Sequence, residues 1–257
     1  MVKNFSKVEY VWIDADGNTR SKCRTIKNEN HRELFVNDLP IWNYDGSSTG
    51  QAIGSDSEVY IRPVKLYPDP FRRDGNYLAL CDTWMSDMKT PHVTNYRFNS
   101  DLTLRKVANK RPWFGFEMEF FMMDINTNLP LGFPMSGETP EQGRFYCSAG
   151  GGRAYGREII EKHYEFCLRA GINITGINAE VACGQWEYQV MGEGIDVADD
   201  AWMTRYILAR VCEEFNVYPD WDPKPIEGDC NGSGMHTNYS TIQMREAGGL
   251  KYILEAI

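Results

Sequence analysis

Two glutamates one residue apart lie in an aromatic stretch of the sequence, WFGFEMEFF at residues 113–121. The length and the aromatic content of this stretch are typical of a buried β-strand. Side chains alternate between the two faces of a strand, so Glu117 and Glu119 share one face, roughly 7 Å apart. The other face is wholly apolar and carries Phe114, Phe116, Met118 and Phe120.

Two ionised carboxylates at that distance on a mostly buried strand repel one another and lose hydration, so they need a neutralising partner. A shared proton is one solution, and a divalent cation is the commoner one. On a half-solvated strand the same pair would simply be two surface acids. The flanking aromatic residues favour burial, and burial favours the cation.

Further acids and an imidazole occur on other predicted strands. A hairpin from Ile172 to Val190 carries Glu180 and Glu187, and a strand over 235–240 carries His236. Four carboxylates with one imidazole suit Mg²⁺ or Mn²⁺ better than zinc, because oxygen ligands dominate. Two such cations can hold a phosphoryl group during its transfer. Polar residues on one strand face are also common where the strand faces solvent, and a lone histidine is more often structural than ligating.

Composition narrows the class of protein. The chain has 257 residues, of which 42% are hydrophobic and 25% charged, and this suits one large or two small globular domains. A net charge of −9 argues against nucleic acid or an anionic membrane as a partner. The seven cysteines are odd in number and scattered, which favours reduced thiols and a cytoplasmic location. The first residues lack the apolar core of a signal peptide, and no run approaches membrane-spanning length.

The first third of the chain reads as mostly β. Residues 7–26 predict a hairpin around the turn Asp16-Gly17, and residues 77–81 predict a short strand. Three prolines, Pro63, Pro68 and Pro70, predict breaks in regular secondary structure in the stretch before residues 77–81. The stretch from Trp42 to Gly50 has no helix or strand period and reads as a mobile connector. A polar segment at 87–92 predicts a domain boundary.

The remainder is expected to combine strands with helices and one long loop. The loop covers residues 126–152, which are rich in glycine and proline, and a loop of that length is often functional. Helices are predicted from Ser100 or Asp101 to Lys110, from Arg153 to Ala170, from Asp196 to Phe215, and from Met244 to Ile257. His163, inside the second of these helices, is interpreted as a half-buried helix residue and not as a ligand.

Several motifs in one order resemble the eukaryotic-type (type II) glutamine synthetases over nearly the whole chain. They are WNYDGSST at 42–49, DPFR at 69–72, WFGFEME at 113–119, RAYGR at 153–157, NAEV at 178–181, QWEYQ at 185–189, Phe215, DPKPI at 222–226, NGSGMHTN at 231–238 and MRE at 244–246. The resemblance implies ATP-dependent ligation of ammonia to L-glutamate through a γ-glutamyl phosphate intermediate. It also implies an α+β fold, with an N-terminal β-grasp domain at 1–92 and, at 93–257, a catalytic domain with a curved antiparallel sheet and flanking helices.

The resemblance also implies roles for individual residues. One Mg²⁺ or Mn²⁺ would be held by Glu119, Glu180 and Glu187, and a second, bridging the ATP phosphates, by Glu117 and His236. The nucleotide region matches Trp113, Glu117, Glu187, Tyr188, Asn238, Tyr239, Ser240 and Arg245. Glutamate would bind at Asn231, Gly232 and His236. Asp45, beside Glu180, matches the carboxylate that helps to bind ammonium and to remove its proton.

Family members form homo-oligomeric rings in which the Asp45 loop completes a neighbour's active site. They also continue well past the position of Ile257, into a segment that carries arginines, a flap and a further metal ligand. We therefore expect a C-terminally truncated form whose own activity is in question. Two alternatives remain open at this point: a ligase that joins glutamate to another amine, and a catalytically inactive assembly protein on the same scaffold.

Overall fold

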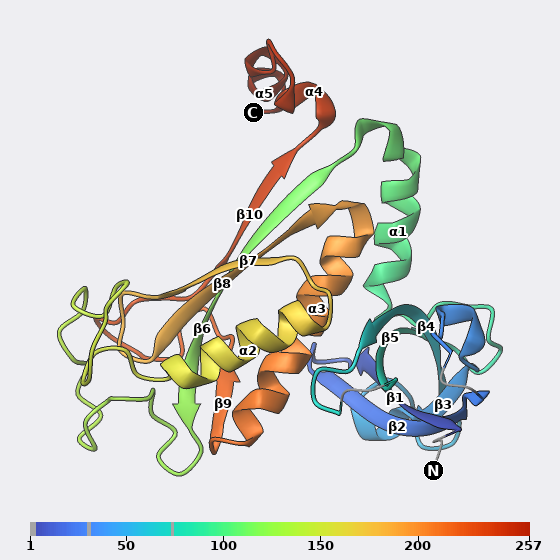
Figure 1. Ribbon diagram of the computed structural model, residues 1–257, viewed down its shortest axis with the longest axis horizontal. Coiled ribbons are helices and arrows are strands. Elements are labelled where there is room, and N and C mark those ends of the chain that lie inside the picture. Colours follow the sequence, from blue (N-terminus) through green and yellow to red (C-terminus); the bar gives the residue numbers. More distant parts are fainter. Residues whose placement is uncertain (1–3, 30–31, 73–74) are drawn as a thin grey trace. The chain divides into compact units, whose positions relative to one another are not determined.

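The computed structural model describes residues 4–29, 32–72 and 75–257 and shows a mixed α/β protein (Figure 1). The chain forms two compact units. The first comprises Met1–Ala108 with Arg169–Gly171, and the second comprises Asn109–Leu168 with Ile172–Ile257. Among the described residues, no helix combines the length and the apolar character needed to cross a bilayer.

The N-terminal unit contains a five-stranded sheet with the strand order β2-β1-β5-β4-β3. Its strands are β1 (Phe5–Ile13), β2 (Thr19–Lys27), β3 (Trp42–Asp45), β4 (Glu58–Pro68) and β5 (Tyr77–Trp84). The pair β1–β5 is parallel, and the other neighbours are antiparallel. The predicted β character of this region and the hairpin at its start are therefore confirmed.

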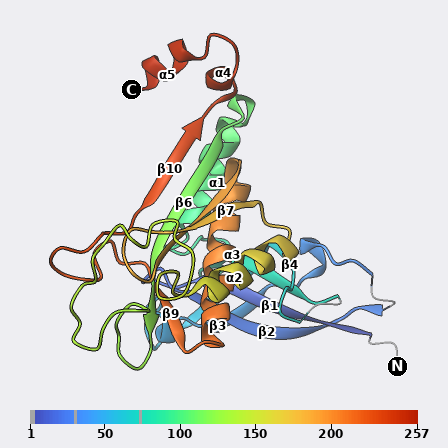
Figure 2. The ribbon, with the colours of Figure 1, turned by 60° about the vertical axis from the view of Figure 1, so that its left-hand side comes forward.

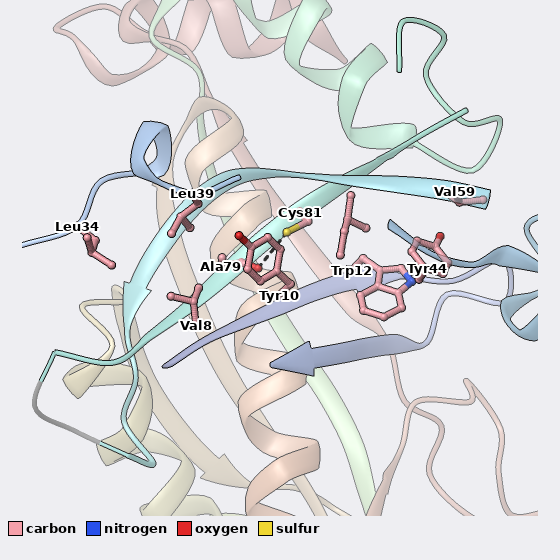
Figure 3. Packing of buried hydrophobic residues seen from close by; sticks show 10 residues of the cluster. Val8, Tyr10, Trp12, Leu34, Leu39, Tyr44, Val59, Ala79 and Cys81 are labelled. Carbon is pink, nitrogen blue, oxygen red and sulfur yellow. Dashed lines mark hydrogen bonds between the residues drawn. The ribbon is translucent and has the colours of Figure 1, made fainter. Parts of the chain in front are cut away.

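The alternating pattern of β1 creates the core of this unit. Val8, Tyr10 and Trp12 point to one side and are at most 5% exposed. Figure 3 shows Val8 and Tyr10 close to Ala79 and Cys81 of β5, and Trp12 beside Tyr44, whose ring centroid is 4.5 Å away. The Tyr10 hydroxyl donates to the carbonyl of Pro40 at 2.9 Å, so its polar end is satisfied inside an apolar cluster.

Two predictions about this unit were wrong in detail. The hairpin turn is a five-residue loop, 14–18, because Asp14 accepts hydrogen bonds from the amides of Asp16 and Asn18. The segment around Pro63 is not interrupted, since β4 continues through this proline with a register shift between Pro63 and Lys65. β3 pairs only with the first residues of β4, so the missing N–H of Pro63 breaks no hydrogen bond on that side.

The C-terminal unit contains a second five-stranded sheet in which all pairs are antiparallel. Its strands are β6 (Trp113–Asp124), β7 (Ile174–Ala179), β8 (Gln185–Glu193), β9 (Val217–Asp220) and β10 (Met235–Ser240). The order is β10-β6-β8-β7, and β9 pairs with the end of β6. Figure 2 shows β10 running beside β6. The predicted strands at 113–121 and 235–240 and the hairpin between 172 and 190 are confirmed.

Five α-helices are found in the described residues: α1 (Tyr96–Lys106), α2 (Arg157–Arg169), α3 (Gly194–Glu213), α4 (Ile242–Arg245) and α5 (Leu250–Ala256). α1 begins earlier than predicted because the Asn95 side chain caps it, accepting from the Phe98 amide at 3.1 Å. The single helix predicted from Met244 to Ile257 is instead two short helices. They are separated where Glu246 is extended and Gly248 has a φ of +83°.

α3 packs against the apolar face of the second sheet. Its fully buried residues include Met203, Ile207 and Leu208, and the sheet contributes Phe120 and Tyr188, both 0% exposed. Phe120 and Tyr188 alternate with the glutamates of β6 and β8, so the acids lie on the opposite face of this sheet. The helix therefore leaves the sheet face that carries these glutamates open.

His163 on α2 is fully buried, more deeply than predicted, and gives a pH-dependent stability. Its Nε2 lies 3.1 Å from the Thr204 carbonyl, and its Nδ1 has no hydrogen-bond partner in the part of the chain that the structure describes. Burial lowers its pKa from 6.5 to about 4. Between pH 6.5 and about 4 the imidazole is protonated in the unfolded chain but remains neutral in the folded protein. The free energy of unfolding therefore falls as the pH drops through this interval. We expect a loss of about 3 kcal/mol from this residue between pH 6.5 and 4.

Urea unfolding of His163→Gln beside the wild type measures this contribution, because other titrating groups cancel in the difference. The glutamine amide can still donate to the Thr204 carbonyl. The control is His236→Gln, which makes the same substitution at an exposed position, so the difference between the two variants isolates the buried ring. Parallel curves for the wild type and His163→Gln would show that the ring is protonated inside the fold.

Candidate active site

The pairing of three strands collects the predicted acids on one face of the C-terminal sheet. Glu119 on β6 lies opposite Glu187 on β8, and Glu117 lies opposite His236 on β10. Residues directly opposite one another in antiparallel strands point to the same side. Glu117, Glu119, Glu187 and His236 therefore share one surface, called here the acidic face. Glu180 joins them from the turn that follows β7.

Each carboxylate of the acidic face is held by a nearby donor. Glu119 Oε2 accepts from the Gly234 amide at 3.0 Å, and Glu117 Oε1 accepts from the Asn238 side chain at 2.6 Å. His236 Nδ1 lies 3.5 Å from Glu117 Oε2.

The two buried carboxylates are held in the same way. Glu180 accepts from Asn178 Nδ2 at 2.9 Å and from the Val181 amide at 3.1 Å, and Glu187 accepts from Gln189. The acids of this face are thus oriented before any ligand binds.

The electrostatics of this face are unfavourable without a positive charge. Burial raises the pKa of both Glu180 and Glu187, each 8% exposed, and repulsion from Glu119 adds to both shifts. No lysine or arginine forms an ion pair with either carboxylate among the ion pairs of the described residues. The donor set is dominated by oxygen and fits Mg²⁺ or Mn²⁺.

The side chains as placed do not close around a single point. In residues 4–29, 32–72 and 75–257, no three histidine, cysteine, aspartate or glutamate side chains come together closely enough to hold an ion. The chemistry of the acidic face thus fits a divalent cation, and its binding would require side-chain rotations that bring the carboxylates together.

A cavity of about 490 Å³ lies at the other end of the same sheet face. Much of the cavity is lined by residues of β6, β8 and β10 whose side chains lie on this face of the sheet. Gly115 has no side chain and leaves space at the floor of the cavity. Its lining is Trp113, Phe114, Gly115, Asn173, Met191, Gly192, Glu193, Asn238, Tyr239 and Ser240. The volume and the aromatic content suit a small organic ligand such as a nucleotide.

Comparison with known proteins agrees with this arrangement. Residues 102–248 match the family model described as glutamine synthetase, catalytic domain. The chain is 48% identical over 250 residues to a protein named glutamine synthetase from Neurospora crassa, covering 97% of this chain and 68% of that protein. The chain belongs to the glutamine synthetase family.

Other relatives give the same result. A probable glutamine synthetase of Caenorhabditis elegans is 51% identical over 252 residues, covering 96% of this chain and 67% of that protein. The solved structure titled "GmaS/ADP complex-Conformation 1" superposes with a TM-score of 0.71 at 17% identity, covering 93% of this chain and 54% of that one. That likeness shows the fold alone. The chain thus spans about two thirds of these curated relatives and about half of the solved structure.

The structure brings four of the eight residues predicted for nucleotide binding in this family to the cavity. Trp113, Asn238, Tyr239 and Ser240 line it. The Arg245 guanidinium lies over the Trp113 ring at 4.0 Å and donates to the Ser240 carbonyl at 2.7 Å.

Tyr188 is placed elsewhere. Its side chain is fully buried under α3, with the hydroxyl 3.0 Å from Thr204 Oγ1, so it does not line the cavity.

The segment predicted to hold glutamate is attached beside the acidic face through Gln185. Gln185 Nε2 donates to the Gly232 carbonyl at 2.9 Å, and Gln185 Oε1 accepts from Asn231 Nδ2 at 3.0 Å. Gln185 lies on β8 two residues before Glu187, so its side chain is on the same strand face. The sequence pattern showed this alternation, but the link from Gln185 to 231–232 could not be read from it.

The Asp45 loop belongs to the N-terminal unit and is ordered, contrary to the interpretation as a mobile connector. Trp42–Asp45 form β3, and Gly46–Thr49 form a 3₁₀ turn that Asp45 caps. The carboxylate accepts from the Ser47 amide at 3.1 Å and from the hydroxyls of Ser47 and Ser48 at 2.6 and 2.8 Å. These hydrogen bonds lower the pKa of Asp45 and keep it ionised.

A buried polar network fixes the base of this loop. Gln51 Oε1 accepts from the Tyr44 hydroxyl at 2.5 Å and from Thr49 Oγ1 at 2.9 Å. His92 Nε2 lies 2.6 Å from the Gln51 carbonyl. The backbone at Gly46 is also packed tightly against β4, since a Cβ at this position would lie 2.5 Å from Val59 Cγ2. The hydrophobic periodicity of the sequence does not reveal such a loop, because tertiary hydrogen bonds determine its conformation.

Tyr146, which no pattern in the sequence singled out, is influenced by the charge of Glu180. The loop carrying it is fastened along 179–181, because the Gly143 amide donates to the Val181 carbonyl and the Cys147 amide to the Ala179 carbonyl, both at 2.9 Å. The pKa of Tyr146 is raised by the neighbouring Cys147 and then by Glu180. The only signal in the sequence was its position in the long loop at 126–152.

Proposed function

We propose that this protein catalyses the ATP-dependent ligation of ammonia to L-glutamate, which yields L-glutamine, ADP and phosphate through a γ-glutamyl phosphate intermediate. The observation that carries the proposal is the position of the acidic face and of a nucleotide-sized cavity on one side of one sheet. The names of the relatives do not favour the amine-ligase or assembly-protein alternatives.

The proposal includes the residue roles that the family resemblance implies. Glu119, Glu180 and Glu187 would hold one Mg²⁺ or Mn²⁺, and Glu117 with His236 would hold a second. When bound there, such cations would neutralise the charge that develops on a transferring phosphoryl group. Asn231 and Gly232 orient the glutamate. Asp45 of a neighbouring copy, beside Glu180, would help to bind ammonium and to remove its proton, and the freed nitrogen lone pair would then attack the γ-carbonyl carbon and displace phosphate.

Several wider expectations belong to the same proposal. The five-stranded mixed sheet of the N-terminal unit supports its assignment as the β-grasp domain of this family. We further propose a homo-oligomeric ring, in which the ordered Asp45 loop would complete a neighbour's site, and a cytoplasmic location. The net charge of −9 and the absence of disulfide bonds among the seven free cysteines are compatible with that location.

Filling the cavity tests the nucleotide site directly. A Cβ at Gly115 would lie 3.5 Å from both Asn238 Cβ and Met191 Cγ, so Gly115→Leu places a side chain in the cavity without a backbone clash. We expect Gly115→Leu to weaken ADP binding at least tenfold in calorimetry with Mn²⁺ present, about 1.4 kcal/mol. The control is Gly151→Leu, where nothing lies within 4 Å of the new Cβ.

The ligase reaction is tested by glutamine formation from glutamate, ammonium and ATP, with methylamine as the competing nucleophile. Preference for ammonium supports the proposal, and preference for methylamine contradicts it. Equal ADP affinity in Gly115→Leu and the wild type would place the nucleotide outside this cavity.

A further inference from the structure

The Trp113 indole presents an open aromatic surface in the nucleotide cavity. Trp113 begins β6, remains 47% exposed and lines the cavity. An exposed tryptophan at a strand end has many rotamers available, and freezing one of them costs conformational entropy. Here the ring is held from two directions before any ligand is present.

Glu193 holds the edge of this ring. It is the cross-strand partner of Trp113 in the β6–β8 pair, and its Oε2 accepts from the indole Nε1 at 3.0 Å. The same carboxylate accepts from Arg111, from Nε at 3.2 Å and from Nη2 at 3.0 Å. These donors lower the pKa of Glu193, so the acceptor is charged and the hydrogen bond to the indole is strengthened.

Arg111 is held in an unfavourable backbone conformation to make this contact. Its φ is +45°, although it is not glycine and it precedes Pro112. Strain of this kind persists where surrounding contacts impose it, and such sites are often functional. Two contacts impose it here: the Gly194 amide donates to the Pro112 carbonyl at 2.9 Å, and Arg245 Nη2 donates to the Arg111 carbonyl at 2.7 Å.

Arg245 stabilises the ring from its face. Its guanidinium carbon lies 4.0 Å from the centroid of the Trp113 ring, which is a cation–π geometry. Arg111 therefore links the two supports, because its side chain positions Glu193 at the ring edge and its carbonyl positions Arg245 at the ring face.

We propose that Glu193 and Arg111 are positioning residues that hold the Trp113 indole as a preformed stacking surface for the nucleobase. An exposed ion pair by itself contributes little to stability, so the purpose of this pair lies in what it orients. The inference rests on the proposed function, since it assumes that the ligand of the cavity is an adenine nucleotide. It predicts that neither residue needs to touch the nucleotide in order to affect its affinity.

The test measures ADP affinity of the 257-residue chain by calorimetry for single and double substitutions. Loss of base stacking in Trp113→Ala should weaken binding about 10- to 100-fold. Glu193→Ala should weaken ADP binding about tenfold, because the conformational entropy lost when the Trp113 ring is ordered then reduces the binding free energy. Glu193→Gln should bind ADP more tightly than Glu193→Ala, since an amide oxygen still accepts from the indole. Arg111→Gln should have an ADP affinity similar to that of Glu193→Gln.

The decisive comparison uses Trp113→Phe, which keeps an aromatic face but has no Nε1–H. If Glu193 acts through the indole, adding Glu193→Ala to Trp113→Phe should change ADP affinity no further. The fluorescence of Trp113, taken as the difference between wild type and Trp113→Phe, should become more accessible to iodide quenching in Glu193→Ala. Glu214→Ala, which removes the exposed ion pair with Lys162, is the control and should alter neither measurement.

The outcomes separate this inference from the proposed function. An equal loss from Glu193→Ala in both backgrounds would assign Glu193 a general structural role and overturn the inference. Unchanged affinity in Glu193→Ala, beside weak binding in Trp113→Ala, would also overturn it and leave the nucleotide site intact. Absence of ADP binding by the wild type would contradict the proposed function itself. Should Glu193→Ala fail to fold, Glu193→Gln and Arg111→Gln in the two backgrounds give the same comparison.

Discussion

Replacing Glu187 by glutamine is expected to stabilise the protein in the absence of divalent cations and to remove most of the stabilisation that Mn²⁺ provides. Glu187 is 8% exposed, and its pKa is raised by burial and by Glu117 and Glu119. Glutamine removes the charge and keeps an oxygen that can accept from Gln189. A neutral amide is also a poor ligand for a hard cation, so the same change weakens binding.

The pH dependence gives the sign of the first effect. Because the pKa of Glu187 in the folded protein lies above its ordinary value of 4.5, the folded state retains a proton that the unfolded chain has already released. Stability of the cation-free protein therefore falls as the pH rises through this interval. Glu187→Gln should show a smaller fall, with the remainder due to Glu180, whose pKa is shifted in the same direction.

Thermal unfolding with and without Mn²⁺ measures both effects. At a free cation concentration one hundred times its Kd, the wild type should gain about 2.7 kcal/mol, and Glu187→Gln should gain much less. Glu138→Gln makes the same charge change at an exposed loop position and should behave as the wild type. Equal stabilisation of all three proteins by Mn²⁺ would place the cation away from the acidic face.

The acidic face illustrates how far local patterns reach. Alternation along residues 113–121 correctly separates Glu117 and Glu119 from the apolar side chains, because the period of a strand is a property of the backbone. The pairing that puts Glu119 opposite Glu187 depends on contacts between distant segments. No local period encodes that register, and here the resemblance to a family supplied what the spacing could not.

The surroundings of Trp113 depend on tertiary contacts alone. Arg111 reads as a linker residue before a proline, and Glu193 as a residue between a strand and a helix. Only the meeting of β6, β8 and β10 brings their side chains to Trp113. Tyr188 was assigned to the nucleotide region by its motif, whereas strand alternation directs its ring into the core beneath α3.

Replacing Asp45 by asparagine is expected to reduce ammonia-dependent glutamine formation by about 10²- to 10⁴-fold, the usual contribution of a positioned acid–base group. The Asp45 carboxylate is exposed, and its hydrogen bonds to Ser47 and Ser48 lower its pKa, so it carries a negative charge at neutral pH. Asparagine keeps an oxygen that can cap the 3₁₀ turn and removes this charge. Asp45→Ala removes both the charge and the cap.

The two substitutions separate the electrostatic role from the structural one. Hydrogen exchange at the Ser47 amide should remain slow in Asp45→Asn and become faster in Asp45→Ala, whereas turnover at limiting ammonium should fall in both. Turnover is measured on the protein as its gene encodes it, with Asp16→Asn in the exposed β1–β2 loop as the control. Normal turnover in Asp45→Asn with low turnover in Asp45→Ala would mean that Asp45 shapes the loop and that its charge does not act on ammonium. Because Gln51, Tyr44 and His92 fix the base of the loop independently of Asp45, neither substitution should unfold the N-terminal unit.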